Sequence, residues 1–115
     1  MRDDTQKALH EYDISTLGVK KYIEAAENFL TNDENVLFVM STNFVITYND
    51  PTKRAACAGV VFLTDKRMLL YYKPNKEEYT DITNYDEIKF VHFQNDDFTG
   101  GSCILVQTND RAYKF

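Results

Sequence analysis

The sequence of 115 residues lacks the features that mark several classes of protein. It has no apolar run near the ~18 residues of a membrane helix, and Met1 to Asp4 do not lead into an apolar signal segment. Its two cysteines, Cys57 and Cys103, form no C-x-x-C pair, and its two histidines are His10 and His92. Neither a disulfide framework nor a zinc module is therefore predicted, and we expect a cytoplasmic protein without metal or cofactor.

The apolar content is sufficient for one folded core. Hydrophobic residues make up 43% of the chain, which contains eight Phe and eight Tyr, a composition that disordered chains lack.

The net charge is -5 and is spread unevenly: residues 1–34 carry four basic and eight acidic side chains, residues 35–79 six and four, and residues 80–115 three and six. Only the middle third could attract an anion, and a nucleic-acid partner is not expected.

Helical spacing of apolar residues predicts helices at 5–12 and 19–30. In the second segment six residues share one face: Val19, Tyr22, Ile23, Ala26, Phe29 and Leu30. An isolated helix of this length is marginal in water. We therefore expect this face to pack on a partner surface, and it is the candidate interaction surface.

After residue 35 the apolar pattern changes from helical to alternating, which predicts strands. The predicted strands cover 36–48, 56–63, 68–72, 79–82, 88–94, 103–107 and 112–115. Short loops in meander order indicate a mainly β fold with N-terminal α-helices, in which seven antiparallel strands form a barrel or sandwich. The expected domains are a helical segment at 1–31 and a β domain at 32–115, with Lys66 and Arg67 as residues of a hairpin turn.

Three segments of the β domain resemble the bacterial pleckstrin-homology (PH-like) domains, which are also similar to GRAM domains. These are residues 30–37 (LTNDENVL), similar to the family's opening, 59–72 (GVVFLTDKRMLLYY), similar to its hairpin, and 83–88 (TNYDEI), similar to an Ile-Pro-Tyr-x-x-Ile element in which Asn84 replaces Pro. The resemblance implies a PH-like barrel or sandwich of seven strands.

The chain departs from the family pattern at its end. PH-like domains close one mouth of the barrel with a C-terminal helix, whereas this sequence stops at Phe115, in the seventh predicted strand. An uncovered mouth would expose apolar core, so we expect the helix at 19–30 to cover it, from the same chain or from a second subunit. Truncation of a longer parent is the alternative explanation.

No constellation of residues predicts catalysis. If the turn after Gln94 is symmetric, His92 lies opposite Cys103, but without an orienting acid or an oxyanion donor we interpret such a pair as packing. Both cysteines are interpreted as small buried apolar residues.

A PH-like barrel would bring five cations to one end: Lys53, Arg54, Lys73, Lys76 and Arg111. Asp50, Glu77, Glu78 and Asp110 would accompany them, so this weak anion patch is close to neutral. A membrane surface gains only ~1 kcal/mol for each uncompensated cation, and lipid binding is therefore disfavoured.

The sequence thus predicts a non-catalytic bacterial PH-like module that binds protein, with a homodimer as the first expectation. Tyrosine is abundant, and it is enriched at protein interfaces. An alternative from another class is a small acidic phage protein that blocks the basic nucleic-acid site of a host defence nuclease. The acidic ends of the chain motivate this alternative, because carboxylates can imitate phosphates.

Overall fold

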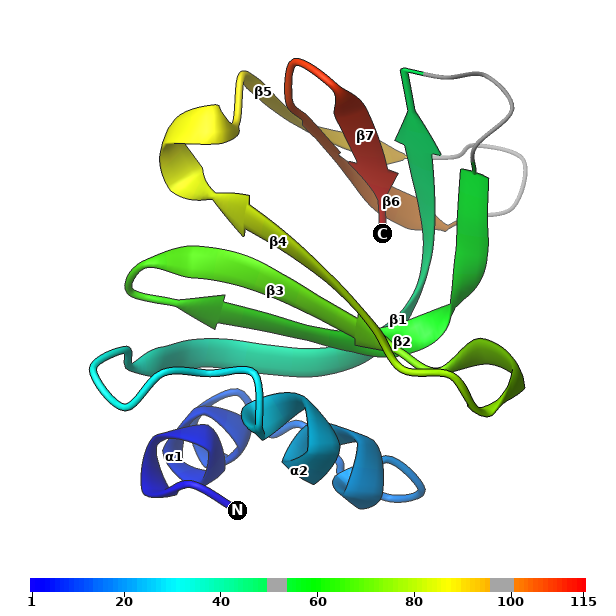
Figure 1. The fold of residues 1–115 in the computed structure, drawn as a ribbon. Coiled ribbons are helices and arrows are strands. Elements are labelled where there is room, and N and C mark those ends of the chain that lie inside the picture. The colour runs from blue at the N-terminus through cyan, green and yellow to red at the C-terminus, as the bar shows by residue number, and fades with distance from the viewer. Residues whose placement is uncertain (50–53, 96–100) are drawn as a thin grey trace. The chain divides into compact units, whose positions relative to one another are not determined.

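The structure is a computed structural model that describes residues 1–49, 54–95 and 101–115 (Figure 1). Two α-helices precede the strands: α1 (Asp3–Glu11) and α2 (Lys20–Glu27). Seven strands follow: β1 (Val36–Tyr48), β2 (Arg54–Thr64), β3 (Arg67–Tyr72), β4 (Tyr79–Asn84), β5 (Phe90–Asn95), β6 (Ser102–Gln107) and β7 (Arg111–Lys114). Short 3-10 turns, η1 (Pro74–Lys76) and η2 (Tyr85–Glu87), flank β4. The prediction of a mainly β fold with seven strands and N-terminal helices is confirmed.

The strands are hydrogen-bonded in the order β4-β3-β2-β1-β7-β6-β5, and the recorded pairings are antiparallel. The last strand thus returns to pair with the first, and β4 and β5 are the two edges. The chain divides into two compact units: unit 1 comprises residues 1–42 and 58–85, and unit 2 comprises residues 43–57 and 86–115. Both β1 and β2 contribute residues to each unit.

In unit 1, α1 and α2 lie against one face of strands β1 to β3 (Figure 1). The shared core contains ten buried residues: Ala8, Leu9, Ile23, Ala26, Val36, Val39, Val60, Phe62, Leu69 and Tyr71. Leu69 lies opposite Phe62, and Tyr71 opposite Val60, so the residues that face the helices come from directly paired positions of β2 and β3. The helices are therefore part of the same hydrophobic core as these strands.

Helix α2 is shorter than predicted, because it ends at Glu27 instead of residue 30. The N–H groups of Asn28, Phe29 and Leu30 donate to carbonyls three residues earlier, a pattern that tightens the last turn. This tightening takes Phe29 and Leu30 off the helical register. Phe29 is exposed as a result, although the helical spacing had placed it on the packed face.

In unit 2, a second apolar group forms on β1, β6 and β7. Ile46 lies opposite Tyr113, and Tyr113 lies opposite Val106, and all three are buried. The ring of Phe115 stacks on Tyr113 with centroids 6.1 Å apart and is 6.5 Å from Phe44. This row of side chains anchors β7 between its two neighbours.

Replacing Ile23 with Ala tests the packing of α2. Ile23 is 1% exposed within the core of unit 1, so the cavity should lower the free energy of unfolding by about 2–5 kcal/mol. The matched control is Leu17→Ala, because Leu17 is 92% exposed and its loss should change stability by less than about 0.5 kcal/mol. Urea denaturation of both variants provides the measurement, and equal midpoints would contradict the packing.

Candidate functional site

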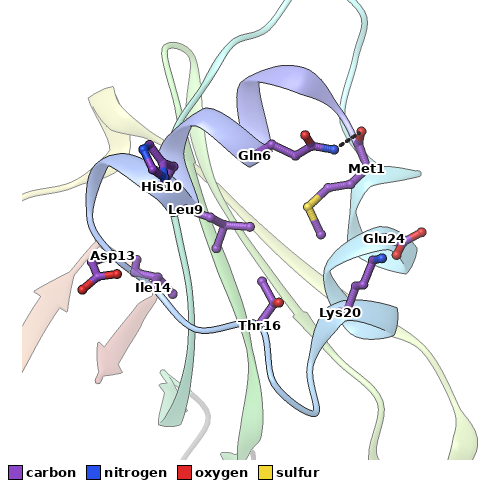
Figure 2. A pocket seen from close by; sticks show the side chains of 9 residues that line it. All are labelled: Met1, Gln6, Leu9, His10, Asp13, Ile14, Thr16, Lys20 and Glu24. Carbon is purple, nitrogen blue, oxygen red and sulfur yellow. Dashed lines mark hydrogen bonds between the residues drawn. The ribbon is translucent and has the colours of Figure 1, made fainter.

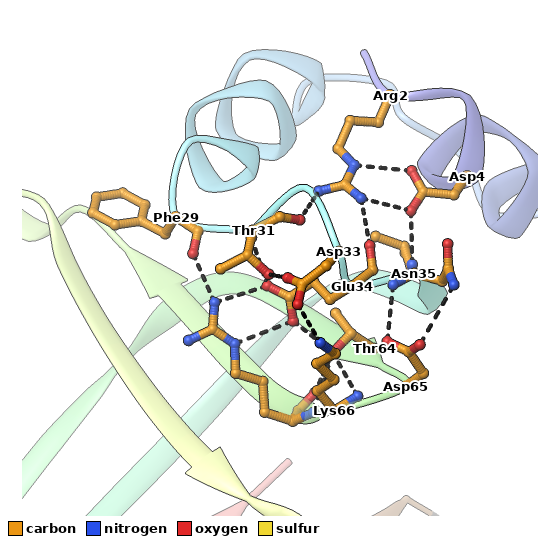
Figure 3. Close-up of polar contacts among 12 residues, drawn as sticks. Arg2, Asp4, Phe29, Thr31, Asp33, Glu34, Asn35, Thr64, Asp65 and Lys66 are labelled. Atoms are coloured by element: carbon orange, nitrogen blue, oxygen red, sulfur yellow. Dashed lines mark hydrogen bonds and ion pairs between the residues drawn. The ribbon is translucent and has the colours of Figure 1, made fainter.

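A buried carboxylate connects the α2–β1 segment to the β2–β3 turn (Figure 3). Glu34 is 1% exposed, and the Arg67 guanidinium donates to its two oxygens at 2.8 and 3.1 Å. The Thr64 hydroxyl and the Thr31 N–H each donate to Glu34 at 2.8 Å. Burial by itself would raise the pKa of Glu34, but these donors outweigh it and lower the pKa to about 2. The carboxylate is therefore ionised and its acceptor sites are occupied.

Further polar contacts extend this cluster to the N-terminus and to η2. Arg2 pairs with Asp4 at 3.0 Å and donates to the carbonyl of Glu34 at 2.6 Å, and Asp4 accepts the N–H of Val36 at 2.8 Å. The Tyr85 hydroxyl donates to a main-chain carbonyl of the hairpin turn. All three segments that carry the PH-like resemblance thus meet here, in a cluster that holds elements together and offers no unused acid or base.

A hollow of about 490 Å³ lies between α1 and α2 (Figure 2). Its apolar lining comes from Met1, Leu9 and Ile14, which also belong to or pack against the core of unit 1. Its ionisable lining has both signs, with Lys20 and Glu24 one turn apart on α2. The carboxylates of Asp13 and Glu24 outnumber the ammonium group of Lys20, so the hollow is a gap in helix packing with a slight excess of negative charge.

The predicted interaction surface is divided between buried and exposed positions. Ile23 and Ala26 are fully buried in the core of unit 1, and Val19 and Leu30 are half-buried against that core. Tyr22 is exposed. The face therefore packs mainly on strands of its own chain, and its role in binding a second protein stays a prediction.

The residues of the predicted anion patch fall in different units. Lys73 and Lys76 follow β3 in unit 1, whereas Arg54 and Arg111 belong to unit 2, and Lys53 lies outside the described residues. Arg111 is already engaged, in ion pairs with the carboxylates of Asp110 at 2.8 Å and Glu87 at 3.2 Å. Lys73 and Lys76 instead line a second hollow, of about 360 Å³, together with Lys21 from α2.

Strand β5 at the edge of unit 2 is exposed along its whole length. Val91 lies opposite Val106, and Phe93 lies opposite Ile104, so these four residues continue the apolar face that contains Tyr113. Exposure along this face rises from 0% at Tyr113 to 7% at Val106 and 60% at Val91, and Phe93 is also 60% exposed. An apolar face thus continues uncovered to the edge of the sheet.

The strand register does not place His92 opposite Cys103, the arrangement considered for a symmetric turn. His92 lies opposite Leu105, and Cys103 lies opposite Gln94. The pairing register of β5 and β6 is therefore shifted by two residues from the register that would set His92 opposite Cys103. Within residues 1–49, 54–95 and 101–115, no group of three or more His, Cys, Asp or Glu side chains is placed to hold a metal ion.

None of the helices formed by the described residues is long and apolar enough to cross a membrane. The sequence matches no family model, and a search of curated proteins found no match. The PH-like resemblance therefore stays a prediction that rests on the three segments that meet around Glu34.

Replacing Glu34 with Gln tests the buried cluster. The Arg67 side chain, which is only 18% exposed, would lose its counter-charge, so we expect the free energy of unfolding to fall by about 3–5 kcal/mol at pH 7. The matched control is Asp33→Asn, because the adjacent Asp33 carboxylate pairs with Lys66 at an exposed position and its loss should matter much less. Equal losses from the two substitutions, measured by urea denaturation, would contradict the assignment.

The Glu34→Gln variant should also differ from the unmodified chain in the pH dependence of its stability. The pKa of Glu34 is about 2 in the folded chain, below its ordinary value of 4.5, so the folded state binds this proton less readily than the unfolded state does. Its stabilisation is present above about pH 4.5 and is lost as the pH falls through about 2. Across that interval the unfolding free energy of Glu34→Gln should fall less steeply with decreasing pH than that of the unmodified chain. Parallel curves would contradict this.

Proposed function

We propose that this chain is a non-catalytic protein-interaction module of the PH-like type that pairs with a second copy of itself through strand β5. The observation that carries the proposal is the uncovered apolar edge formed by Val91, Phe93 and Ile104. Soluble proteins seldom leave a contiguous apolar patch without a partner. The seven antiparallel strands are compatible with the PH-like resemblance.

The composition of β5 favours pairing at its free edge. Alternate residues of an edge strand direct their N–H and C=O groups away from the sheet. Natural edge strands are commonly protected by a charge or a proline, yet β5 (FVHFQN) contains no Lys, Arg, Asp, Glu or Pro. The opposite edge, β4 (YTDITN), carries Asp81 near its centre. Of the two edges, β5 is the one without a charge against strand addition.

A second copy of β5 fits this edge better than a charged partner strand does. Each chain has a net charge of -5, so two copies repel each other least where they meet through an uncharged strand. Antiparallel pairing about a two-fold axis at His92 would set Val91 of each copy opposite Phe93 of the other. Both residues lie on the same face of the strand, so this register extends the apolar face across the dimer. The contact is self-complementary, as a two-fold interface requires.

This arrangement leaves the N-terminal helices in place. Helix α2 packs on strands of its own chain, and pairing through β5 does not require that packing to open. Because a single pair of short strands contributes modest binding energy, we expect a dimer that depends on concentration.

A double substitution, Val91→Lys with Phe93→Lys, tests the proposal. Both side chains are exposed, so the fold should tolerate the change, but each new ammonium group would face another across the two-fold axis. We expect the dissociation constant of the dimer to rise by about tenfold or more. Sedimentation velocity over a dilution series provides the measurement.

The matched control is Leu37→Lys, because Leu37 is also exposed and lies in unit 1, whereas β5 belongs to unit 2. This variant should dimerise as the unmodified chain does. A chain that is monomeric at all concentrations would overturn the proposal, and so would a dimer that both variants weaken equally.

A further inference from the structure

The second hollow, of about 360 Å³, lies in unit 1 between α2 and the segment that follows β3. Helix α2 contributes Lys21, Tyr22 and Ala25 to its lining, β3 contributes Tyr71, and the β3–β4 connection contributes Lys73 and Lys76. Lys21 and Ala25 are one helical turn apart, so they occupy the same face of α2. The side chains of three lysines and two tyrosines therefore border one space.

The three lysines are not neutralised by their surroundings. Among the residues that the structure describes, none of the three takes part in an ion pair. Lys66, by contrast, pairs with Asp33. The positive charge around the hollow is thus available to an anion.

The two acidic residues that directly follow Lys76, Glu77 and Glu78, are hydrogen-bonded to tyrosines. The Tyr79 hydroxyl donates to Glu77 at 2.7 Å. Burial raises the pKa of Tyr71, and the Glu78 carboxylate, which accepts a hydrogen bond from the Tyr71 hydroxyl, raises that pKa further. Glu78 offsets part of the charge of the lysines, and an excess of positive charge remains.

The backbone of the β3–β4 connection holds Lys76 in an uncommon conformation. Asn75 and Lys76 have φ angles of 54° and 70°. Asparagine tolerates this left-handed region, but lysine seldom occupies it, and glycine would adopt it without strain. Pro74, at the start of the turn, fixes its own φ and limits the alternatives. The chain therefore places a long cationic side chain beside the hollow at a position where glycine would be favoured.

We infer that this hollow binds a small organic phosphomonoester, with Lys21, Lys73 and Lys76 as the groups that hold its phosphate. A phosphate monoester carries close to two negative charges near neutral pH, which suits several ammonium groups. The volume lies at the lower end of the range for small-molecule pockets and exceeds what a bare phosphate fills. The ring of Tyr22 and the methyl group of Ala25 provide an apolar surface for the organic part.

Phenyl phosphate is the probe, with inorganic phosphate and phenol for comparison, and binding is followed by calorimetry and by amide chemical shifts. We expect saturable binding of phenyl phosphate, weaker binding of inorganic phosphate and none of phenol. The shifted amides should lie on α2 and at residues 71–76. The double variant Lys21→Gln with Lys76→Gln should weaken binding by about twenty-fivefold, or about fivefold for each charge.

The matched control is Lys7→Gln with Lys20→Gln, which removes two exposed charges, one from α1 and one from α2, without changing the lining of this hollow. The control should change the affinity by less than about threefold, since exposed charges that do not line the hollow are partly screened by salt. The inference is overturned if phenyl phosphate does not bind, or if the control and the lining variant weaken binding equally.

A phosphomonoester could be a soluble metabolite or the head group of phosphatidate. Cosedimentation with vesicles that contain phosphatidate, with and without phenyl phosphate as competitor, distinguishes these sources. Vesicle binding that phenyl phosphate displaces assigns the head group to the same site. Binding of phenyl phosphate without vesicle binding assigns the soluble source.

Discussion

The ion pair of Glu34 and Arg67 is the interaction on which the arrangement of unit 1 depends. A charge that is removed from water destabilises a fold unless its hydrogen-bonding capacity is satisfied. The Glu34 carboxylate meets this condition through the Arg67 guanidinium, the Thr64 hydroxyl and the Thr31 N–H. These groups come from the α2–β1 connection and from the β2–β3 turn, so the ion pair can form only when both segments have their native conformations.

The same constraint accounts for the end of α2. The helix stops at Glu27, and the next residues tighten into a turn that brings Thr31 within reach of Glu34. Arg67 also donates to the carbonyl of Phe29 at 2.8 Å, which satisfies a group left without a helical partner. The polar cluster thus takes the place of a conventional helix cap, and its position sets where the helices meet the strands.

The alternation of apolar residues was sufficient to predict the strands. The bounds predicted for β1 coincide with those observed, and the hairpin at 64–67 lies where its turn residues indicated. Strand periodicity is a local property, because every second residue of a strand with one buried face must be apolar. The strands on either side of the turn each have such a face. The end of α2 was not predictable in this way, because it depends on contacts with Arg67, which is nearly forty residues away in the sequence.

The residues of the candidate sites were harder to predict for the same reason. From the sequence, Arg67 was interpreted as a residue of the hairpin turn. Its ion pair with the buried Glu34 carboxylate is evident only in the structure. Lys21 lies on the polar face of its helix, and no spacing rule relates it to Lys73 and Lys76 across the β3–β4 connection. The exposure of β5 depends on its position at the end of the strand order, which local sequence does not encode.

The passage of β1 and β2 through both units affects how the protein can be divided. The chain crosses from one unit to the other after residues 42, 57 and 85, and two of these crossings lie inside continuous strands. Neither unit is a contiguous stretch of sequence. No single cut in the gene therefore separates them, and a fragment that ends at any crossing leaves one of the long strands, or its partner, incomplete. Expression or recombination that keeps both long strands complete must therefore include both units together.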